Sequence, residues 1–425
     1  MVNRIIAIFK ELQRNPWKVL FLLVYVIVSC LLWEKRGIVY QCVIKENMPY
    51  MNIAKIILDG VGIMLFVYLF TLLVVALTTP IGSKKANMNL LKIGFTNKTG
   101  EPPRLMAKYK DAHMPKVIVY EFESLGIPIS EWEKKLAVIE SALNIQVVTL
   151  GYGRNIRQIV VKAVSSNKQL PNYLAWTDKL LSTEDFELVL GESLYGLEKL
   201  NLVIYPHILI GGGTNSGKST LMKTLLMQCI KKQAQVYIID FKGGVDFSAP
   251  LWHQKCKIII EQTELLHCLE EITVELEKRR TLLIESGCPN IETYNKKNSK
   301  SIQRIIFASD EIAEILDKTG LSKEQKEIVS TIERQMSFLA RQGRAFGIHL
   351  FLSTQRPSAD ILSGQIKNNI ALRICGRADR VLSEIILDNT SAVEKVPQSI
   401  QGRFITNEGT IFQGYYIDDD MDYLE

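Results

Sequence analysis

The feature that most constrains the fold is a glycine-rich segment near the middle of the 425-residue chain, residues 212–219, which reads GGTNSGKS. The run HILI (207–210) comes directly before it, and the apolar-rich stretch 221–231 follows it. Glycines let backbone N–H groups surround phosphates, and the N-terminus of the next helix adds a partial positive charge. The spacing GxxxxGK[ST] between a strand and a helix therefore predicts a nucleotide-binding P-loop.

The residues of this loop have predicted roles in binding phosphate and Mg²⁺. Lys218 is expected to reach the β- and γ-phosphates of ATP, and Ser219 to ligate Mg²⁺. The predicted nucleotide-binding residues are Gly212, Gly213, Thr214, Asn215, Ser216, Gly217, Lys218, Ser219 and Thr220.

A second hydrophobic run, 304–311, reads RIIFASDE and ends in two acids. Asp310 is expected to hold Mg²⁺ through water, and Glu311 to act as the general base on the attacking water. Adjacent acids can also form a solvated turn, but at the end of a buried strand both would carry a desolvation cost. The pair favours ATP hydrolysis over nucleotide binding alone. Gln355 ends another strand and is either a sensor of the γ-phosphate or an ordinary strand-end glutamine.

Strand and helix patterns alternate through the second half of the chain. The expected strands are 235–240 and 349–353, and the expected amphipathic helices are 264–285 and 323–345. This alternation predicts an α/β fold with a parallel sheet covered on both faces. Upstream, a small α/β unit is expected from the segments 116–124, 129–143, 146–150 and 157–164.

Two uncharged apolar runs, 19–33 and 60–78, lie near the N-terminus. Their lengths suit transmembrane helices at about 17–33 and 60–78. Basic residues flank the outer sides of the pair, so the positive-inside rule places both chain ends in the cytoplasm and a short loop outside. The alternative is a cleaved signal peptide, with 27–30 resembling a lipoprotein cleavage box. Cleavage there would export an ATPase to a compartment without ATP.

The net charge of +6 is concentrated in the window 81–116, which holds eight basic and two acidic residues. Because the rest of the chain is balanced, any contact with nucleic acid must come from local geometry in the folded domains. The window is either a juxtamembrane segment that contacts anionic lipids or a solvated linker. Seven scattered cysteines without metal-ligand spacing make zinc unlikely and suggest reduced cytoplasmic thiols.

The run 339–374, LARQGRAFGIHLFLSTQRPSADILSGQIKNNIALRI, closely resembles the FtsK/SpoIIIE DNA translocases. Further matches are LGESLYG (190–196), Pro206-His207, DFKGG (240–244) and ILD (386–388), and the resemblance spans about 117–404. It implies a RecA-like motor that assembles as a ring, usually a hexamer, around DNA, with ATP sites at subunit interfaces. An arginine from the neighbouring subunit then completes each site, and the candidates are Arg344, Arg373, Arg377 and Arg380.

The layout differs from that of the cell-division translocases, which carry about four membrane spans, a long linker and a winged-helix domain after the motor. Two spans, almost no linker and an acidic end at 418–422 are similar to the FtsK-like coupling proteins of Gram-positive conjugative elements. That resemblance implies a membrane-anchored DNA translocase that serves a relaxase and a transfer channel. Alternatives are a chromosome-partitioning translocase, a protein-secretion ATPase of the type VII kind, and a scaffold that only binds ATP. The residues do not distinguish single- from double-stranded DNA.

The expected organisation has four parts. A membrane anchor occupies 1–83, a basic juxtamembrane linker 84–116, a small α/β domain 117–198, and the P-loop motor 199–425.

Overall fold

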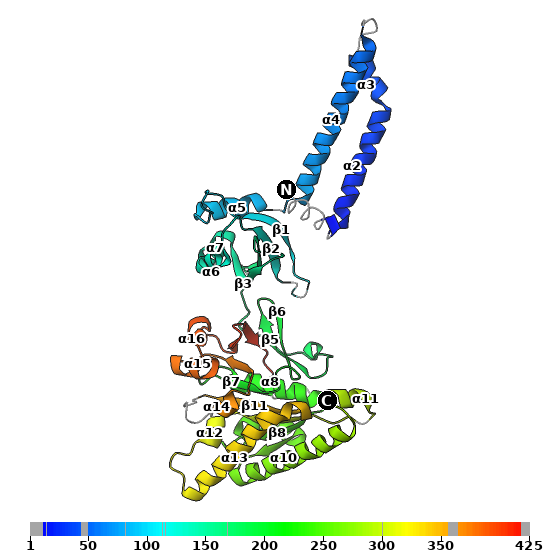
Figure 1. Cartoon of the computed structure of the whole chain (residues 1–425). Coiled ribbons are helices and arrows are strands. Elements are labelled where there is room, and N and C mark those ends of the chain that lie inside the picture. Colours follow the sequence, from blue (N-terminus) through cyan, green and yellow to red (C-terminus); the bar gives the residue numbers. More distant parts are fainter. Residues whose placement is uncertain are drawn as a thin grey trace. The chain divides into compact units, whose positions relative to one another are not determined.

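The structure is a computed structural model that describes residues 12–13, 15–43, 50–80, 82–112, 114, 116–167, 169–299, 301–355 and 364–417. The chain divides into two compact units, Met1–Lys168 and Gln169–Glu425 (Figure 1). The acidic end at 418–422 and the Arg356-Pro357 pair of the family block lie outside the described residues.

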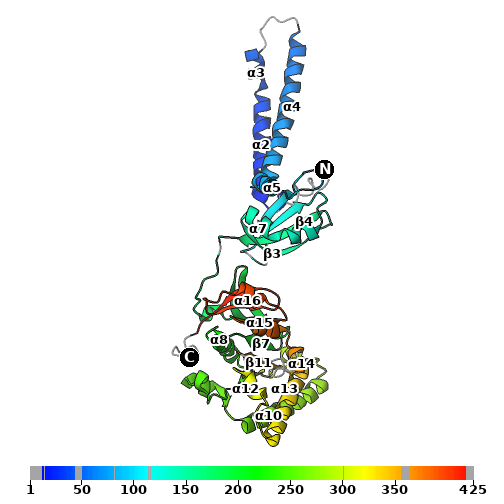
Figure 2. The same cartoon turned by 90° about the vertical axis from the view of Figure 1, so that its left-hand side faces the viewer.

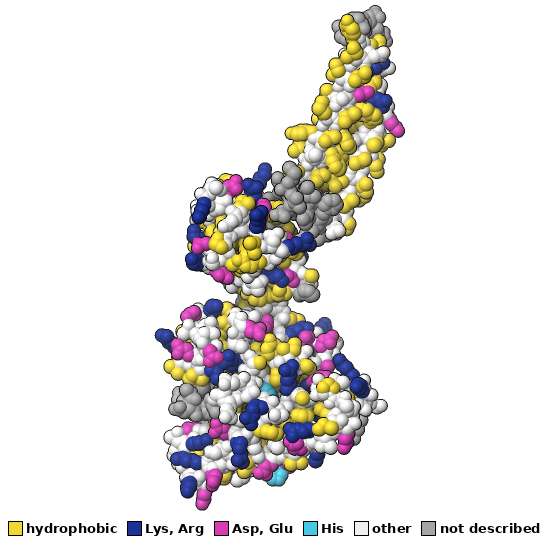
Figure 3. Space-filling model, in the orientation of Figure 1, with side chains coloured by type: hydrophobic (Ala, Val, Ile, Leu, Met, Phe, Trp, Pro, Cys, Tyr) yellow, Lys and Arg dark blue, Asp and Glu magenta, His cyan; other side chains and the backbone are white. Residues whose placement is uncertain are grey.

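Two long apolar helices with a short one between them begin the first unit, namely α2 (Pro16–Glu34), α3 (Arg36–Val43) and α4 (Met51–Thr78). The most apolar windows of α2 and α4 have mean hydropathies of 2.0 and 2.6, and none of their residues is buried. The two helices lie side by side in both ribbon views (Figures 1 and 2), and the Tyr25 hydroxyl donates to the Phe66 carbonyl at 3.0 Å. Apolar side chains cover most of the pair (Figure 3). Their length and composition suit membrane crossing, as the sequence predicts.

The rest of the first unit is a small antiparallel sheet with helices, in the strand order β1-β2-β4-β3. Its strands are β1 (Arg104–Lys110), β2 (Ile118–Glu123), β3 (Ile145–Tyr152) and β4 (Gln158–Ser165), and its helices are α5 (Ser83–Lys92), α6 (Ile129–Lys134) and α7 (Leu136–Leu143). Aromatic side chains fill its core: the rings of Phe95 and Trp132 meet edge to face with centroids 4.9 Å apart, and Phe122 is fully buried.

The basic segment 84–116, expected as a linker, is instead part of this domain. Helix α5 buries Leu90, and β1 pairs with β2 along its length while burying Leu105. The lysines and arginines dominate the composition of the segment, but they alternate with apolar side chains that point into the core. The prediction of a linker counted the charges and overlooked the alternation of polar and apolar residues that is typical of a strand.

The expected boundary at residue 198 also differs from the observed one. Strands β5 (Glu187–Ser193) and β6 (Gly196–Asn201) belong to the sheet of the second unit, because β5 pairs with β14 (Ile411–Gly414). This pairing joins segments far apart in the chain, so no local pattern indicated it.

The second unit is built on one sheet, for which the described residues give ten strands in the order β6-β5-β14-β13-β12-β7-β11-β10-β8-β9. The strands from β12 to β9 in that order run parallel, whereas β13, β14, β5 and β6 extend the sheet antiparallel. The sheet is thus mixed rather than wholly parallel. The remaining strands are β7 (Ile208–Gly211), β8 (Gln235–Ile239), β9 (Cys256–Ile259), β10 (Ile305–Ser309), β11 (Ile348–Thr354), β12 (Leu372–Cys375) and β13 (Arg403–Thr406).

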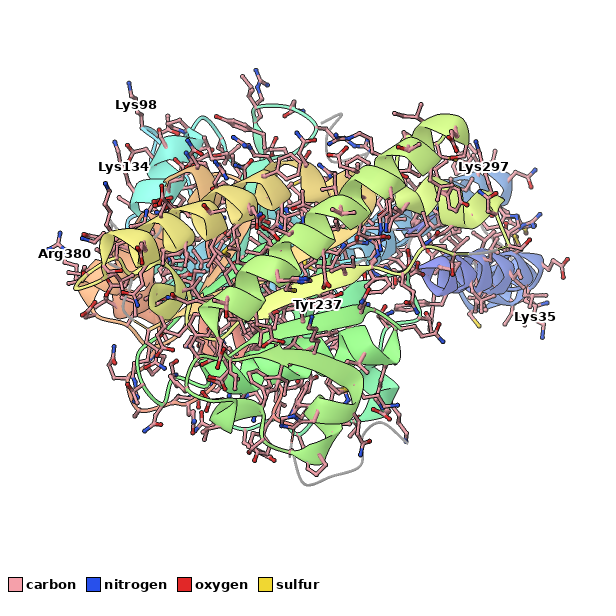
Figure 4. All side chains as sticks on the ribbon, turned by 90° about the horizontal axis from the view of Figure 1, so that it is seen from below. Lys35, Lys98, Lys134, Tyr237, Lys297 and Arg380 are labelled. Atoms are coloured by element: carbon pink, nitrogen blue, oxygen red, sulfur yellow. The ribbon has the colours of Figure 1, made fainter. Side chains whose placement is uncertain are left out.

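Helices cover both faces of this sheet, and alternate residues of one strand point to opposite faces. On β10, Ile305 and Phe307 pack with α10 and α13, whereas Ile306 and Ala308 pack with α8. Helices α10 and α13 lie side by side across one face, on the side of Tyr237 (Figure 4). The helices are α8 (Lys218–Lys231), α9 (Pro250–Lys255), α10 (Gln262–Glu285), α11 (Ile291–Lys297), α12 (Ile312–Leu316), α13 (Lys323–Gln342), α14 (Gly364–Lys367), α15 (Arg380–Leu387) and α16 (Ser391–Lys395), with 3₁₀ turns η1 (Asp178–Leu180), η2 (Val245–Phe247) and η3 (Gly343–Phe346).

Two buried histidines, His207 and His349, lie where the parallel strands β7 and β11 begin. Arg304 contacts the His349 ring at 3.0 Å and pairs with Glu292 at 2.7 Å, while the other ring nitrogen of His349 lies 2.9 Å from the Pro206 carbonyl. Burial holds the pKa of His349 well below 6.5, and the positive charge of Arg304 adds to the effect. Burial alone lowers the pKa of His207 to about 4. Both rings are therefore neutral in the folded protein at neutral pH.

Candidate active site

The phosphate-binding loop connects β7, near the centre of the sheet, to α8. Asn215 and Gly217 have left-handed backbone angles, with φ of 61° and 92°. A Cβ at Gly217 would lie 2.9 Å from the backbone nitrogen of Gly402, which donates to the Ser216 carbonyl at 2.9 Å. Only glycine therefore fits at 217, for conformation and for space.

The loop encloses a cavity of about 200 Å³. Its lining residues are Gly213, Asn215, Ser216, Gly217, Lys218, Ser219, Thr220, Gln355 and Gln401. Seven of the nine predicted loop residues therefore face this cavity. The other two, Gly212 and Thr214, contact neighbouring strand ends: the Gly212 N–H donates to the Thr354 carbonyl at 3.3 Å, and the Thr214 hydroxyl donates to Gln355 Oε1 at 3.4 Å.

Lys218 and Asp310 meet inside the protein. Lys218 is 3% exposed, and its Nζ donates to the Asp310 carbonyl and to the Ser353 hydroxyl, each at 2.9 Å. It also lies 3.4 Å from Asp310 Oδ1. The parallel register of β10 and β11 pairs Ser309 with Leu352, so Asp310, which follows β10, lies beside Ser353 near the carboxyl end of β11.

The second carboxylate oxygen of Asp310 has no hydrogen-bond partner among the described residues, although the side chain is only 2% exposed. Lys242 Nζ lies 3.8 Å from this oxygen. Burial lowers the pKa of Lys242, but the negative charges of Asp310 and Asp246 outweigh this and the net pKa is raised. A buried carboxylate with an unused oxygen, which contacts Lys218 of the phosphate loop, is the kind of oxygen donor that Mg²⁺ prefers, and the next loop residue, Ser219, offers a hydroxyl oxygen. The residues fit a magnesium site.

Glu311, which follows β10, forms hydrogen bonds with residues at the end of β11. Its Oε1 accepts from the Thr354 hydroxyl at 2.7 Å, and its Oε2 accepts from the Gln355 N–H at 2.9 Å. It also caps α12, accepting from the Ala313 N–H at 3.4 Å. The structure therefore brings together the two residues predicted as base and sensor, Glu311 and Gln355, although 43 residues separate them.

Two of the candidate arginines are engaged away from the cavity. Arg373 pairs with Asp388 at 2.5 Å, and within the part of the chain that the structure describes its buried Nε makes no hydrogen bond. Arg344 donates through Nε to the Val203 carbonyl at 3.1 Å. Neither side chain lines the phosphate cavity of its own chain.

The other two arginines lie in the segment after β12. Arg377 donates to the Thr214 carbonyl, so it supports the phosphate loop of its own chain. Arg380 pairs with Glu384 at 2.8 Å on the surface of α15 and is 77% exposed, and Figure 4 shows it at the edge of the molecule. Arg344 and Arg380 are thus exposed, whereas Arg373 and Arg377 are half-buried.

Sequence reasoning missed several residues that shape this site. Lys242 lies in the DFKGG segment and Ser353 in the run 339–374, both of which match the family. The sequence therefore marked these segments, but it did not show that the two side chains lie beside Asp310 and Lys218. Gln401 comes from the segment before β13 and reaches the cavity only through the sheet pairing, so no local pattern could have revealed it.

A parallel-rich sheet with a P-loop at the end of a central strand, β7, and acids after β10, from which β7 is separated by β11, defines a P-loop ATPase. Residues 186–359 match the FtsK/SpoIIIE family. This part of the chain is an FtsK/SpoIIIE domain.

The relatives are named as DNA translocases and as a coupling protein. The chain is 34% identical over 218 residues to the DNA translocase FtsK of Treponema pallidum (strain Nichols), which covers 48% of this chain and 26% of that one. It is 29% identical over 335 residues to DNA translocase FtsK of Streptococcus agalactiae serotype V, covering 69% of this chain and 39% of that one. The chain thus spans about a quarter to two fifths of these relatives.

A solved structure matches more of the chain. It is that of the pCW3 conjugation coupling protein TcpA, monomer form with ATPγS, which is 36% identical, has a TM-score of 0.58, and covers 80% of this chain and 96% of that one.

Proposed function

We propose that this protein is a membrane-anchored, ATP-driven DNA translocase that acts as the coupling protein in the conjugative transfer of a mobile element. The observation that carries the proposal is the likeness to TcpA, which covers 80% of the chain. The second unit is about three fifths of the chain, so this likeness extends into the first unit. The match to the FtsK/SpoIIIE family, 186–359, lies within the second unit alone.

In the proposed hydrolytic cycle, Lys218 exchanges its bonds to Asp310 and Ser353 for the β- and γ-phosphates. Mg²⁺, when held by Ser219 and Asp310, neutralises charge on those phosphates. Glu311 orients the attacking water and accepts its proton, and its bonds to Thr354 and Gln355 fix the carboxylate in place.

The proposed assembly is a homo-oligomeric ring, a hexamer, in which an arginine from the next subunit reaches each ATP site. Arg380 is the preferred donor because its side chain is 77% exposed and its one recorded partner, Glu384, lies one turn away in the same helix. Arg344 and Arg373 are the less favoured candidates since each is held by its own chain.

The proposed substrate is DNA, gripped through its phosphates in a salt-sensitive manner, while the choice of sequence is left to a relaxase partner. Helices α2 and α4 anchor the protein beside the transfer channel. Lys18, Lys84 and Lys85 lie next to the outer ends of the helix pair, so we place both ends of the pair and the ATPase unit in the cytoplasm.

The test is transfer of the mobile element from cells that carry only Lys218→Ala. We expect loss of transfer with normal division, and normal transfer from the matched control Lys255→Ala, which removes an exposed lysine of α9. Normal transfer in the Lys218→Ala strain would overturn the coupling role. A chromosome-segregation defect would instead support the partitioning translocase, and loss of a secreted protein would support the secretion ATPase.

A further inference from the structure

A second hollow lies beside the phosphate cavity. It has a volume of about 190 Å³ and shares Gly217, Thr220 and Gln401 with the first. Its other lining residues are Asn172, Tyr173, Leu174, Leu221, Gly402, Phe404, Gln413, Gly414, Tyr415 and Tyr416. Because Gly217 and Thr220 flank the lysine and serine that meet the phosphates, whatever fills this hollow lies next to a bound phosphate chain.

The hollow has an apolar floor and an aromatic rim. Leu221 and Phe404 are each 1% exposed at its floor. At the rim, the rings of Tyr173 and Tyr416 have centroids 5.7 Å apart, and the two side chains remain 62% and 42% exposed. Flat aromatic surfaces of this kind stack with nucleobases.

One wall of the hollow belongs to the segment that begins the second unit. The buried Arg403 donates to the Pro171 carbonyl at 2.9 Å and so fixes one end of this segment. At its other end, the Tyr416 N–H donates to the Leu174 carbonyl at 2.8 Å, and the Trp176 N–H donates to the Tyr416 carbonyl at 2.8 Å. Residues 172–173 span the interval between these two anchors and face the hollow.

We propose that this hollow binds the purine base of the nucleotide, with Tyr173 as its stacking residue, and that base binding holds residues 172–173 in place. Residues 172–173 lie near the start of the second unit, which begins at Gln169. The inference rests on ATP binding and not on the conjugative role.

The proposal predicts how nucleotides are distinguished. A stacking surface with an apolar floor recognises ring area more than hydrogen-bonding pattern, so ATP and GTP should bind within a few-fold of each other. CTP and UTP, which carry a single ring, should bind more weakly. Inorganic tripolyphosphate, which has no base, should bind only through the P-loop.

The experiment measures equilibrium binding to the full chain in detergent. We expect Tyr173→Ala to weaken ATPγS binding about 5- to 20-fold, near the lower part of the range for loss of one base stack because the ring is half exposed. Tyr173→Phe keeps the ring and should bind as the parent does. Tripolyphosphate should bind equally to all three proteins, which shows that the P-loop remains folded.

A second readout follows the backbone itself. ATPγS should slow hydrogen exchange of the amides at Asn172 and Tyr173, whereas tripolyphosphate should leave it unchanged. Unaltered ATPγS affinity in Tyr173→Ala would overturn the base site. Equal protection of these amides by both ligands would overturn the role of the base in holding the segment.

Discussion

Replacing Glu311 by glutamine separates the chemical step from nucleotide binding. The side chain keeps its length, and the structure shows how the amide can be accommodated. Its oxygen can accept from the Gln355 N–H, as Oε2 does now, while its NH₂ group can donate to the Thr354 hydroxyl, which can rotate to become an acceptor. The loss of a charged acceptor should cost roughly 1 kcal/mol of stability at most.

The rate should fall much further than the stability. A positioned general base contributes about 10²- to 10⁴-fold, which corresponds to about 3 to 5 kcal/mol of activation free energy. Glu311→Gln should therefore bind ATPγS with nearly the parental affinity while its phosphate release slows by at least about 100-fold.

The assay compares phosphate release and ATPγS binding in the same preparation of the full chain. Glu314→Gln is the matched control, since Glu314 is an exposed glutamate of α12, the helix that Glu311 caps, and lies three residues further along the chain. We expect its turnover to equal that of the parent. Turnover of Glu311→Gln within about tenfold of the parent would remove Glu311 from the role of base.

Acid should destabilise the second unit. In the folded protein the pKa of His207 is about 4, and the pKa of His349 lies well below 6.5. Below about pH 6.5, therefore, these histidines bind protons in the unfolded chain but not in the folded chain. Stability present above that pH should fall by up to about 1.4 kcal/mol per pH unit for each histidine, and an unchanged thermal midpoint between pH 7 and 5 would contradict this. For the arginine in trans, Arg380→Ala should abolish ATPase activity in the assembled protein. Mixing it with Lys218→Ala should restore part of that activity. Where the P-loop of an Arg380→Ala subunit faces the arginine of a Lys218→Ala subunit, the site is complete. No recovery on mixing would exclude Arg380.

Local sequence patterns determined the elements that carry the chemistry. The P-loop could be predicted because its glycines and lysine are contiguous and its strand and helix flank it directly. Asp310 and Glu311 could be predicted because they end a continuous apolar run, β10, which is buried on both faces. The two long apolar helices, α2 and α4, could be predicted from uninterrupted apolar length, a property of composition along one segment.

Tertiary structure decided everything that depends on pairing between distant segments. The basic segment 84–116 folds with the small domain because β1 finds a partner in β2, and β5 joins the second unit because it pairs with β14. In the site, Gln401 reaches the phosphate cavity, and Arg373 is held by Asp388 while Arg380 remains exposed. Such contacts arise from the order and register of strands in the sheet, and sequence periodicity reports only which face of an element is apolar, not which element covers it.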